Sequence, residues 1–138
     1  MTENIHATAV AIDGKAILLI GQSGSGKSDL ALRLIMNKNA VLIADDRVDI
    51  VNVNGVLKAS CPQNIKGLLE VRGVGICKYP FIDAAEVKMA IQLVSSPDEV
   101  DRLPEYTTKK FCELDIPCIK IWAFENSAPD KIIAACNR

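Results

Sequence analysis

The sequence predicts an α/β domain that contains a P-loop and is built from a mixed sheet with flanking helices. Three observations lead to this prediction. An apolar strand pattern, Ala16–Ile20, precedes a glycine-rich loop, and a helical pattern, Asp29–Met36, follows it. Two turn pairs, Asp13-Gly14 and Asn54-Gly55, each separate two strand patterns and so predict antiparallel hairpins. Hairpins beside a strand–loop–helix unit require parallel and antiparallel neighbours in one sheet.

Length and composition limit the function classes. With 138 residues, 49% of them hydrophobic, the chain has room for one domain, residues 1–138, with a real core. A net charge of −1 without a basic block argues against nucleic acid as the main partner. Five cysteines without C-x-x-C spacing favour free thiols in a reducing cytoplasm over disulfides or a zinc site. The absence of a signal-peptide pattern or long apolar run favours a soluble, cytoplasmic protein without a membrane partner.

The glycine-rich loop reads Gly21-Gln22-Ser23-Gly24-Ser25-Gly26-Lys27-Ser28 and fits the phosphate-loop pattern G-x-x-x-x-G-K-[ST] at every fixed position. Glycines let the backbone approach an anion, so that successive N–H groups at a helix N-terminus can cradle phosphates. Lys27 adds a cation, and the Ser28 hydroxyl can ligate Mg²⁺. The strand before the loop and the helix after it are the context that this motif needs. The alternative is a glycine- and serine-rich turn that binds nothing.

The first predicted hairpin locates the only histidine of the chain. If Asp13-Gly14 alone forms the loop between Ile5–Ile12 and Lys15–Ile20, then Ile12 pairs with Lys15. The same ladder sets Thr8 opposite Leu19 and His6 opposite Gly21. The register therefore predicts His6 at the mouth of the phosphate loop; the alternative is a polar residue on the surface of an edge strand.

Acidic residues follow the apolar strand Val41–Ala44, as Asp45-Asp46. Ligands gather at the carboxyl ends of such strands, where nucleotide hydrolases and kinases place acidic groups. Adjacent residues of an extended chain point to opposite sides, so we expect one aspartate in the site and the other in a structural role. A solvated loop start is the alternative.

Glu70 and Arg72 are two residues apart and would share one face of a strand. There they could serve a metal and a phosphate together, or form an exposed salt bridge. The remaining elements follow from turn and periodicity signals. We expect a hairpin of Arg47–Val53 and Val56–Ala59, a loop at Pro80–Val87, strands at Met89–Val94 and Ile116–Phe124, a polar connection at Ser95–Pro104, and a helix capped by Ser127 that runs through Asn137.

Taken in order, His6, Gly21–Ser28, Ala44–Asp49 and Leu68–Ile76 resemble the catalytic domain of HPr kinase/phosphorylase. The Leu68–Ile76 block looks like that family's own signature segment, and Asp101-Arg102-Leu103 looks like its D-R-L. The resemblance implies a fold like that of phosphoenolpyruvate carboxykinase and assembly into homohexamers. It also implies that the protein uses ATP to phosphorylate a serine of HPr, a small carrier protein of the sugar phosphotransferase system. Many members also run the reverse reaction with inorganic phosphate, yielding pyrophosphate.

The resemblance further implies roles for individual residues. Lys27 and the loop amides would hold the β- and γ-phosphates of ATP, and Ser28 with Glu70 would bind Mg²⁺. Asp46 would take the proton of the incoming serine and return it in the reverse reaction. His6 matches a histidine near the loop. Arg102 matches an arginine that is tied to the site, on a loop that can reach a neighbouring subunit.

The chain also departs from the family pattern. Ala7 stands where the family usually has glycine after its histidine, and only five residues precede His6, as in a short form without the N-terminal domain of long members. Phe124–Pro129 lacks the positive charge that the equivalent segment has in long members, where it is linked to dephosphorylation. Kinase activity is therefore the main expectation. A small-metabolite kinase and a non-catalytic ATP-binding regulatory module are the alternatives.

Overall fold

The computed structural model describes residues 2–138, which form ten strands and two α-helices. The helices are α1 (Lys27–Asn37) and α2 (Ala128–Cys136), and two short 3₁₀ helices are η1 (Gln63–Ile65) and η2 (Pro97–Glu99). The strands are β1 (Thr2–Ile12), β2 (Lys15–Ile20), β3 (Val41–Ala44), β4 (Arg47–Val53), β5 (Val56–Ser60), β6 (Leu68–Val71), β7 (Gly75–Lys78), β8 (Ala84–Leu93), β9 (Thr107–Phe111) and β10 (Leu114–Ile121).

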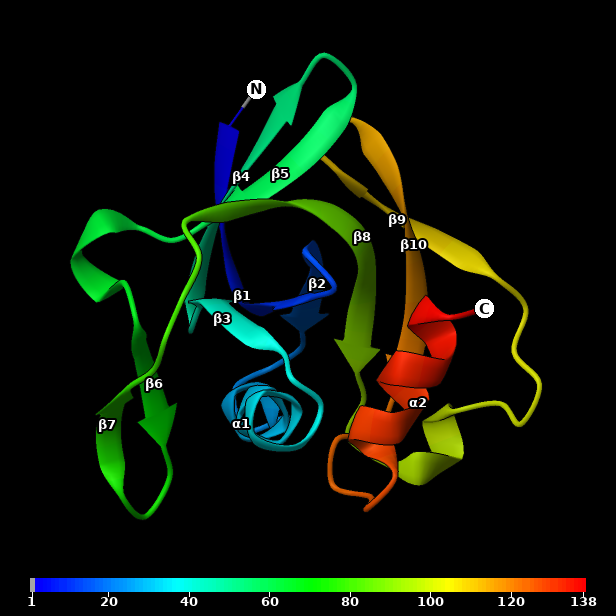
Figure 1. Ribbon diagram of the computed structural model, residues 1–138. Helices are drawn as coiled ribbons and strands as arrows, with labels where there is room; N and C mark the ends of the chain where they lie inside the picture. Colours follow the sequence, from blue (N-terminus) through cyan, green and yellow to red (C-terminus); the bar gives the residue numbers. More distant parts are fainter. Residues whose placement is uncertain (1) are drawn as a thin grey trace.

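Eight strands form one mixed sheet that folds over itself, because its two longest strands each take part in both halves (Figure 1). The first part of β1 pairs with β4 and the first part of β8 pairs with β5. Their later parts pair with β2, which lies between them, and β10 continues that half beyond β8. The α/β fold with a mixed sheet is thus confirmed.

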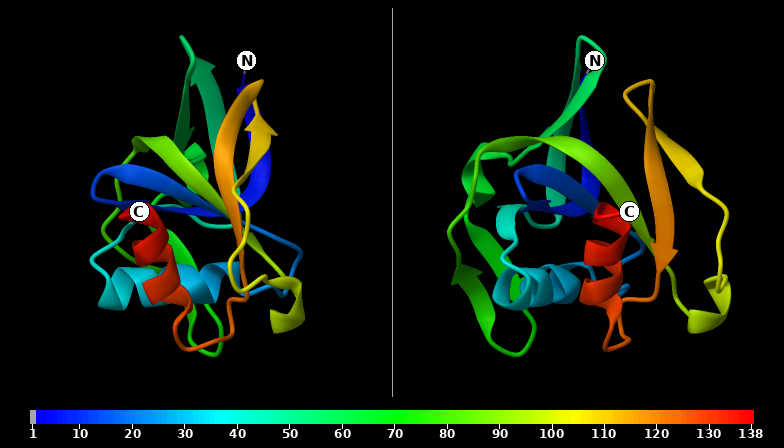
Figure 2. Two further views of the ribbon diagram at one scale, coloured as in Figure 1. Left: turned by 90° about the vertical axis from the view of Figure 1, so that its right-hand side faces the viewer. Right: turned by 45° about the vertical axis from the view of Figure 1, so that its right-hand side comes forward.

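The core has two layers because side chains alternate along the strands. Val10, Ile12, Ile17 and Leu19 of β1 and β2 pack with Leu30, Leu34 and Ile132 of the helices. The residues between them, which include Ala9, Ala11, Ala16 and Leu18, pack inside the folded sheet against β4, β5 and β8. Both helices cover the same face of the sheet (Figure 2). Many side chains of this inner layer are alanines.

The strands bring the glycine-rich loop and the paired aspartates to one edge. β2, β8 and β10 run parallel, and β3 runs in the same direction because both β2 and β3 are antiparallel to β1. Their carboxyl ends therefore meet at the same edge of the sheet, where ligands bind in open α/β folds. The Gly21–Ser28 loop leaves β2 there and Asp45-Asp46 leaves β3 there.

The hairpin predictions are confirmed, including their registers. Ile12 pairs with Lys15 and Thr8 pairs with Leu19, and the last pair, Ala7 with Ile20, brings His6 beside Gly21. The second hairpin joins β4 to β5 through Asn54-Gly55. The predicted loop Pro80–Val87 is wrong in its second half, because β8 already begins at Ala84 and pairs there with β5.

Three further features differ from the sequence prediction. The edge strand β9 was not predicted, since Thr107–Lys110 is exposed and polar and gives no apolar alternation. The last strand, expected over Ile116–Phe124, runs from Leu114 to Ile121. Ser127 precedes α2, but its side chain makes no capping hydrogen bond.

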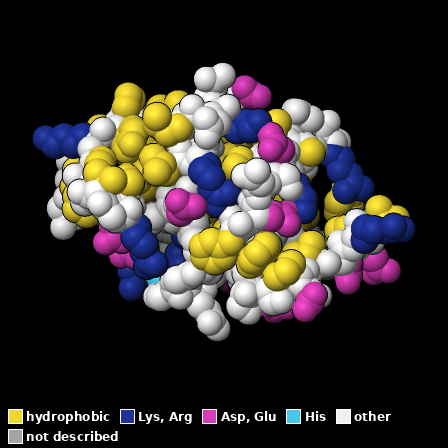
Figure 3. All heavy atoms as spheres, turned by 90° about the horizontal axis from the view of Figure 1, so that it is seen from below, with side chains coloured by type: hydrophobic (Ala, Val, Ile, Leu, Met, Phe, Trp, Pro, Cys, Tyr) yellow, Lys and Arg dark blue, Asp and Glu magenta, His cyan; other side chains and the backbone are white. Residues whose placement is uncertain are grey.

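The end of the molecule that carries α1, α2 and the β6–β7 hairpin has a mixed surface. Seen from below, hydrophobic side chains gather there in patches separated by charged groups (Figure 3). Neither α-helix within residues 2–138 has the length and apolar character needed to cross a membrane.

Candidate functional site

The glycine-rich loop leaves the start of α1 open to an anion. Gly24 and Gly26 have φ of 83° and 96°, in the left-handed region that favours glycine. A Cβ at Gly26 would also lie 2.9 Å from the Cβ of Ala123 and 3.3 Å from Cε1 of Phe124, so glycine is required for space as well. Gly26 is the N-cap residue, and no side chain caps the helix. The first N–H groups of α1 are therefore available to a bound anion.

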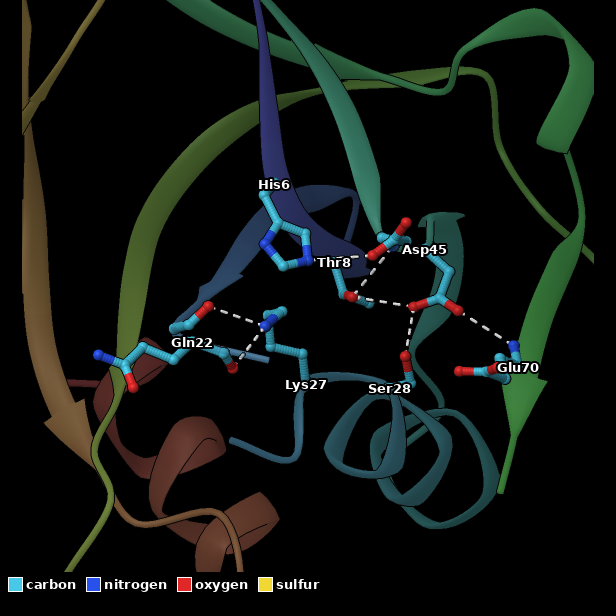
Figure 4. Close-up of polar contacts among 9 residues, drawn as sticks. His6, Thr8, Gln22, Lys27, Ser28, Asp45 and Glu70 are labelled. Carbon is cyan, nitrogen blue, oxygen red and sulfur yellow. Dashed lines mark hydrogen bonds and ion pairs between the residues drawn. The ribbon is translucent and has the colours of Figure 1, made fainter. Parts of the chain in front are cut away.

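Lys27 lies inside the curve of the loop with only 8% of its surface exposed. Its Nζ donates hydrogen bonds to the carbonyl oxygens of Gly21 at 2.8 Å and Gln22 at 3.0 Å (Figure 4). Burial lowers the pKa of Lys27, and the negative charges of Asp46 and Asp45 raise it in part. The cation is thus held by backbone oxygens beside the cradle and faces two carboxylates.

Asp45 joins four elements through one buried carboxylate. Its Oδ1 accepts hydrogen bonds from Ser28 Oγ at 2.6 Å and from Thr8 Oγ1 at 2.9 Å. Its Oδ2 accepts one from the backbone N–H of Glu70 at 3.0 Å. Asp45 is only 7% exposed, so these bonds replace the water that a carboxylate requires (Figure 4). Asp45 thereby fixes α1 and β6 relative to β1 and β3.

Asp46 points into the open side of the site. It has a φ of 70°, so the chain turns sharply between the two aspartates and their side chains diverge. Its Oδ1 lies 3.0 Å from Nε2 of His6, and 72% of its side chain is exposed. The backbone oxygen of Asp46 accepts a hydrogen bond from the N–H of Ala7 at 3.2 Å, which holds the turn against β1.

A pocket of about 560 Å³ brings most of the predicted site residues together. Its lining includes six of them that carry polar side chains: His6, Ser23, Lys27, Ser28, Asp46 and Glu70. Gly24, Gly26 and Arg72 also line it, so Glu70 and Arg72 share this pocket, although β6 ends at Val71 and Arg72 lies in the turn after it.

Other predicted residues lie outside this pocket. Gly21 contributes its carbonyl to Lys27, and Gln22 and Ser25 line a second cavity of about 340 Å³ on the other side of the loop. Ser25 Oγ is buried without a hydrogen-bond partner in the described part of the chain. Arg102 lies in the exposed connection between η2 and β9 and does not line the pocket.

A family model described as the HPr Serine kinase C-terminal domain matches residues 1–137. The chain belongs to this family. Among curated relatives, the HPr kinase/phosphorylase of Lactobacillus acidophilus is 34% identical over 129 residues, which is 86% of this chain and 40% of the relative. That of Burkholderia lata is 40% identical over 109 residues, 72% of this chain and 34% of the relative. The chain thus spans well under half the length of these relatives.

A solved structure of an HPr kinase family protein has the same fold. The HPr(Ser) kinase/phosphatase of Coxiella burnetii superposes with a TM-score of 0.85 at 27% sequence identity. The match covers 98% of this chain and 94% of the Coxiella chain. The arrangement of strands described above is therefore that of the HPr kinase family.

Sequence reasoning missed two residues of this HPr kinase family site. Thr8, with no exposed surface, holds Asp45 by a hydrogen bond, and its signal was a hydroxyl within the apolar run Ala7–Ile12. Phe124 was assigned to the end of a strand, yet it lies beyond β10 and lines the pocket. An aromatic residue that is 56% exposed next to a glycine-rich loop could have been found only from the fold.

The residues at the loop suit Mg²⁺. The hydroxyl of Ser28 and the carboxylates of Asp45, Asp46 and Glu70 are hard oxygen donors, the kind that Mg²⁺ prefers. Within residues 2–138, His, Cys, Asp and Glu side chains form no group of three or more that could hold a metal by itself. Mg²⁺ in phosphate-transfer sites commonly uses one or two protein carboxylates, with substrate phosphates and water as its other ligands.

Proposed function

We propose that this domain is a Mg²⁺- and ATP-dependent protein-serine kinase that phosphorylates HPr or a related phosphocarrier. One observation carries the proposal: the exposed carboxylate of Asp46 lies in the same pocket as the open start of α1, Lys27 and Ser28. A phosphate cradle beside an exposed carboxylate suits transfer to a hydroxyl, because the reaction needs positioning, charge stabilisation and a proton acceptor. The names of the relatives supply the acceptor.

In the proposed reaction, the serine hydroxyl of the carrier attacks the γ-phosphorus of ATP. The new Oγ–P bond forms as the bond from the γ-phosphorus to the bridging oxygen breaks, and ADP leaves with that electron pair. Asp46 takes the hydroxyl proton, and His6, at 3.0 Å, holds the carboxylate in place. Lys27 exchanges its carbonyl partners for the β- and γ-phosphate oxygens, where its charge offsets the charge that develops.

A Mg²⁺ ion at this position would offset the negative charge of the phosphates. We propose that Ser28 and Glu70 hold it. Asp45 keeps the Ser28 hydroxyl in position through the 2.6 Å hydrogen bond, and the same carboxylate fixes the backbone of Glu70. These two contacts support a ligand pair that is oriented before substrate arrives.

We further propose that the protein works in the cytoplasm as a homo-oligomer, a hexamer by family resemblance. Arg102 lies on an exposed connection of the single chain, which suits a residue that reaches the site of a neighbouring subunit. Reversal by inorganic phosphate, which yields pyrophosphate, is the weaker part of the proposal, because Phe124–Pro129 carries no cation to seat a second anion.

The test combines the protein with Mg²⁺, γ-labelled ATP and HPr, and locates the label on the carrier. We expect label on one serine of HPr and none on a carrier in which that serine is alanine. Asp46→Asn should lower the rate, whereas Asp115→Asn, which changes an aspartate paired with Lys110 on the surface, serves as the matched control. Transfer to small acceptors but not to HPr, or ATP binding without any transfer, would refute the proposal. The same mixture with phospho-HPr and inorganic phosphate tests the reverse reaction.

A further inference from the structure

The pocket extends beyond the groups that the proposed transfer uses. Leu32 of α1, Val71 of β6 and Phe124 line its remaining wall, together with two exposed charged residues, Arg72 and Asp29. Leu32 comes four residues after Ser28, so it lies about 6 Å further along the helix axis. The pocket therefore has a polar end at His6 and Asp46, and its three apolar side chains gather toward the other end, which we call the apolar end.

Phe124 is an unusual side chain at this apolar end. It is 56% exposed, yet its ring lies against the loop, where Cε1 and Cζ would be 3.3 Å from a Cβ at Gly26. Arg33 of α1 donates hydrogen bonds to the backbone oxygens on both sides of it, those of Ala123 and Glu125. Trp122 packs edge-on against the ring with 6.2 Å between centroids. The aromatic ring is thus held at the pocket while part of its surface stays open.

We infer that this apolar end binds the nucleoside of the ATP, with the base stacked on Phe124 and packed against Leu32 and Val71. The inference rests on the proposed function, because the triphosphate must lie in the cradle at the start of α1. If the γ-phosphate faces Asp46, the α-phosphate and nucleoside must leave in the other direction, along α1. Bases stack readily on aromatic side chains, and the Arg72 guanidinium can add a cation–π contact.

The second cavity, beside Gln22 and Gln92, provides the competing location for the nucleoside. Phe124 lines both cavities, but Leu32 lines only the first and Gln92 only the second. The side chain of Gln22 points away from Lys27 toward that second cavity (Figure 4). A nucleoside there would lie on the side of the loop away from Ser28 and Glu70, so we favour the first location. Variants at Leu32 and Gln92 distinguish the two.

The experiment is calorimetric titration of the full chain, with Mg²⁺, by ATP and separately by sodium tripolyphosphate. Phe124→Ala should raise the Kd for ATP about tenfold, within the range of roughly 5- to 150-fold that corresponds to the loss of one base–aromatic contact. Leu32→Ala should raise it by a smaller factor. Both variants should bind tripolyphosphate as the unchanged protein does, because the cradle is intact. Phe124→Trp should retain ATP binding within about threefold, since it keeps an aromatic ring.

Two variants serve as controls. Tyr106→Ala removes another exposed aromatic side chain, 62% exposed and outside both cavities, and should leave both titrations unchanged. Gln92→Ala should also leave ATP binding unchanged. The inference is overturned if Phe124→Ala leaves the Kd for ATP unaltered, or if it weakens the binding of ATP and of tripolyphosphate equally. It is also overturned if Gln92→Ala weakens ATP binding while Leu32→Ala does not, or if the unchanged protein binds no ATP. A protein that shows the expected pattern but never labels HPr would refute the proposed acceptor and leave the nucleoside site standing.

Discussion

Thr8 provides the sharpest test of how this site is built. It has no exposed surface, and its hydroxyl donates a 2.9 Å hydrogen bond to the buried carboxylate of Asp45. Thr8→Val keeps the shape and the β-branched character suited to a strand but removes the donor. Asp45 would then keep its bonds from Ser28 and Glu70 and lose the third. A hydrogen bond to a charged group contributes about 1.5–3 kcal/mol, so we expect Thr8→Val to lower the free energy of unfolding by about that amount.

The assay is urea unfolding followed by circular dichroism, with thermal unfolding as a second measurement. For a chain of this size the loss corresponds to a fall in Tm of about 5–10 °C. Thr8→Ser should recover most of the stability, because it restores the hydroxyl. Thr108→Val, at an exposed position of β9, is the matched control and should change the free energy of unfolding by less than about 0.5 kcal/mol. If Thr8→Val is as stable as the unchanged protein, Asp45 does not organise the site as described.

Three more changes have defined outcomes. Asp46→Asn should lower the rate of phosphoryl transfer about 10²-fold or more while the Kd for ATP, measured by calorimetry, stays within a few-fold, because only the proton acceptor is removed. Gly26→Ala should abolish tripolyphosphate binding in the same titration, since its φ is 96° and the added Cβ would lie 2.9 Å from that of Ala123; undiminished binding would contradict the cradle geometry. Burial raises the pKa of four thiols above their ordinary value of 9.0, so they stay protonated in the folded state while those of the unfolded chain ionise. The urea concentration at the unfolding midpoint should therefore fall as the pH rises above about 9. Alanine substitution of these cysteines should make that midpoint less dependent on pH. The four residues are Cys61, Cys112, Cys118 and Cys136.

The sequence predicted those parts of the fold that local patterns determine. Asp13-Gly14 set a two-residue turn, and the turn set the register of β1 against β2 down to Thr8 opposite Leu19. That register predicted that His6 lies near the loop, and in the structure its Nε2 lies 3.0 Å from Oδ1 of Asp46. The phosphate-loop pattern likewise predicted the strand before it and the helix after it.

Tertiary pairing determined the parts that local patterns missed. β9 is polar and exposed over Thr107–Lys110, and it exists because β10 offers it an antiparallel edge. Ala84–Val87 looked like a loop, yet β8 starts there because Ala85 pairs with Ala59 of β5. Phe124 was placed in a strand by its apolar neighbours, whereas its position depends on Arg33, a residue 91 positions earlier whose hydrogen bonds hold the adjoining carbonyls. Contacts of such long range leave no local pattern.

The paired aspartates show why a correct general rule could not assign the individual roles. Alternation along an extended chain predicted that only one of them enters the site, but the chain is not extended at Asp46, whose φ is 70°. The divergence comes from a sharp turn, which Ala7 holds through its N–H and which Asp45 anchors through Thr8, Ser28 and Glu70. Those partners come from three other elements. Asp45 is buried, where its carboxylate accepts hydrogen bonds from three other elements, whereas the turn leaves the Asp46 carboxylate exposed beside His6. The same residue type thus contributes to stability at one position and, in the proposed reaction, accepts a proton at the next.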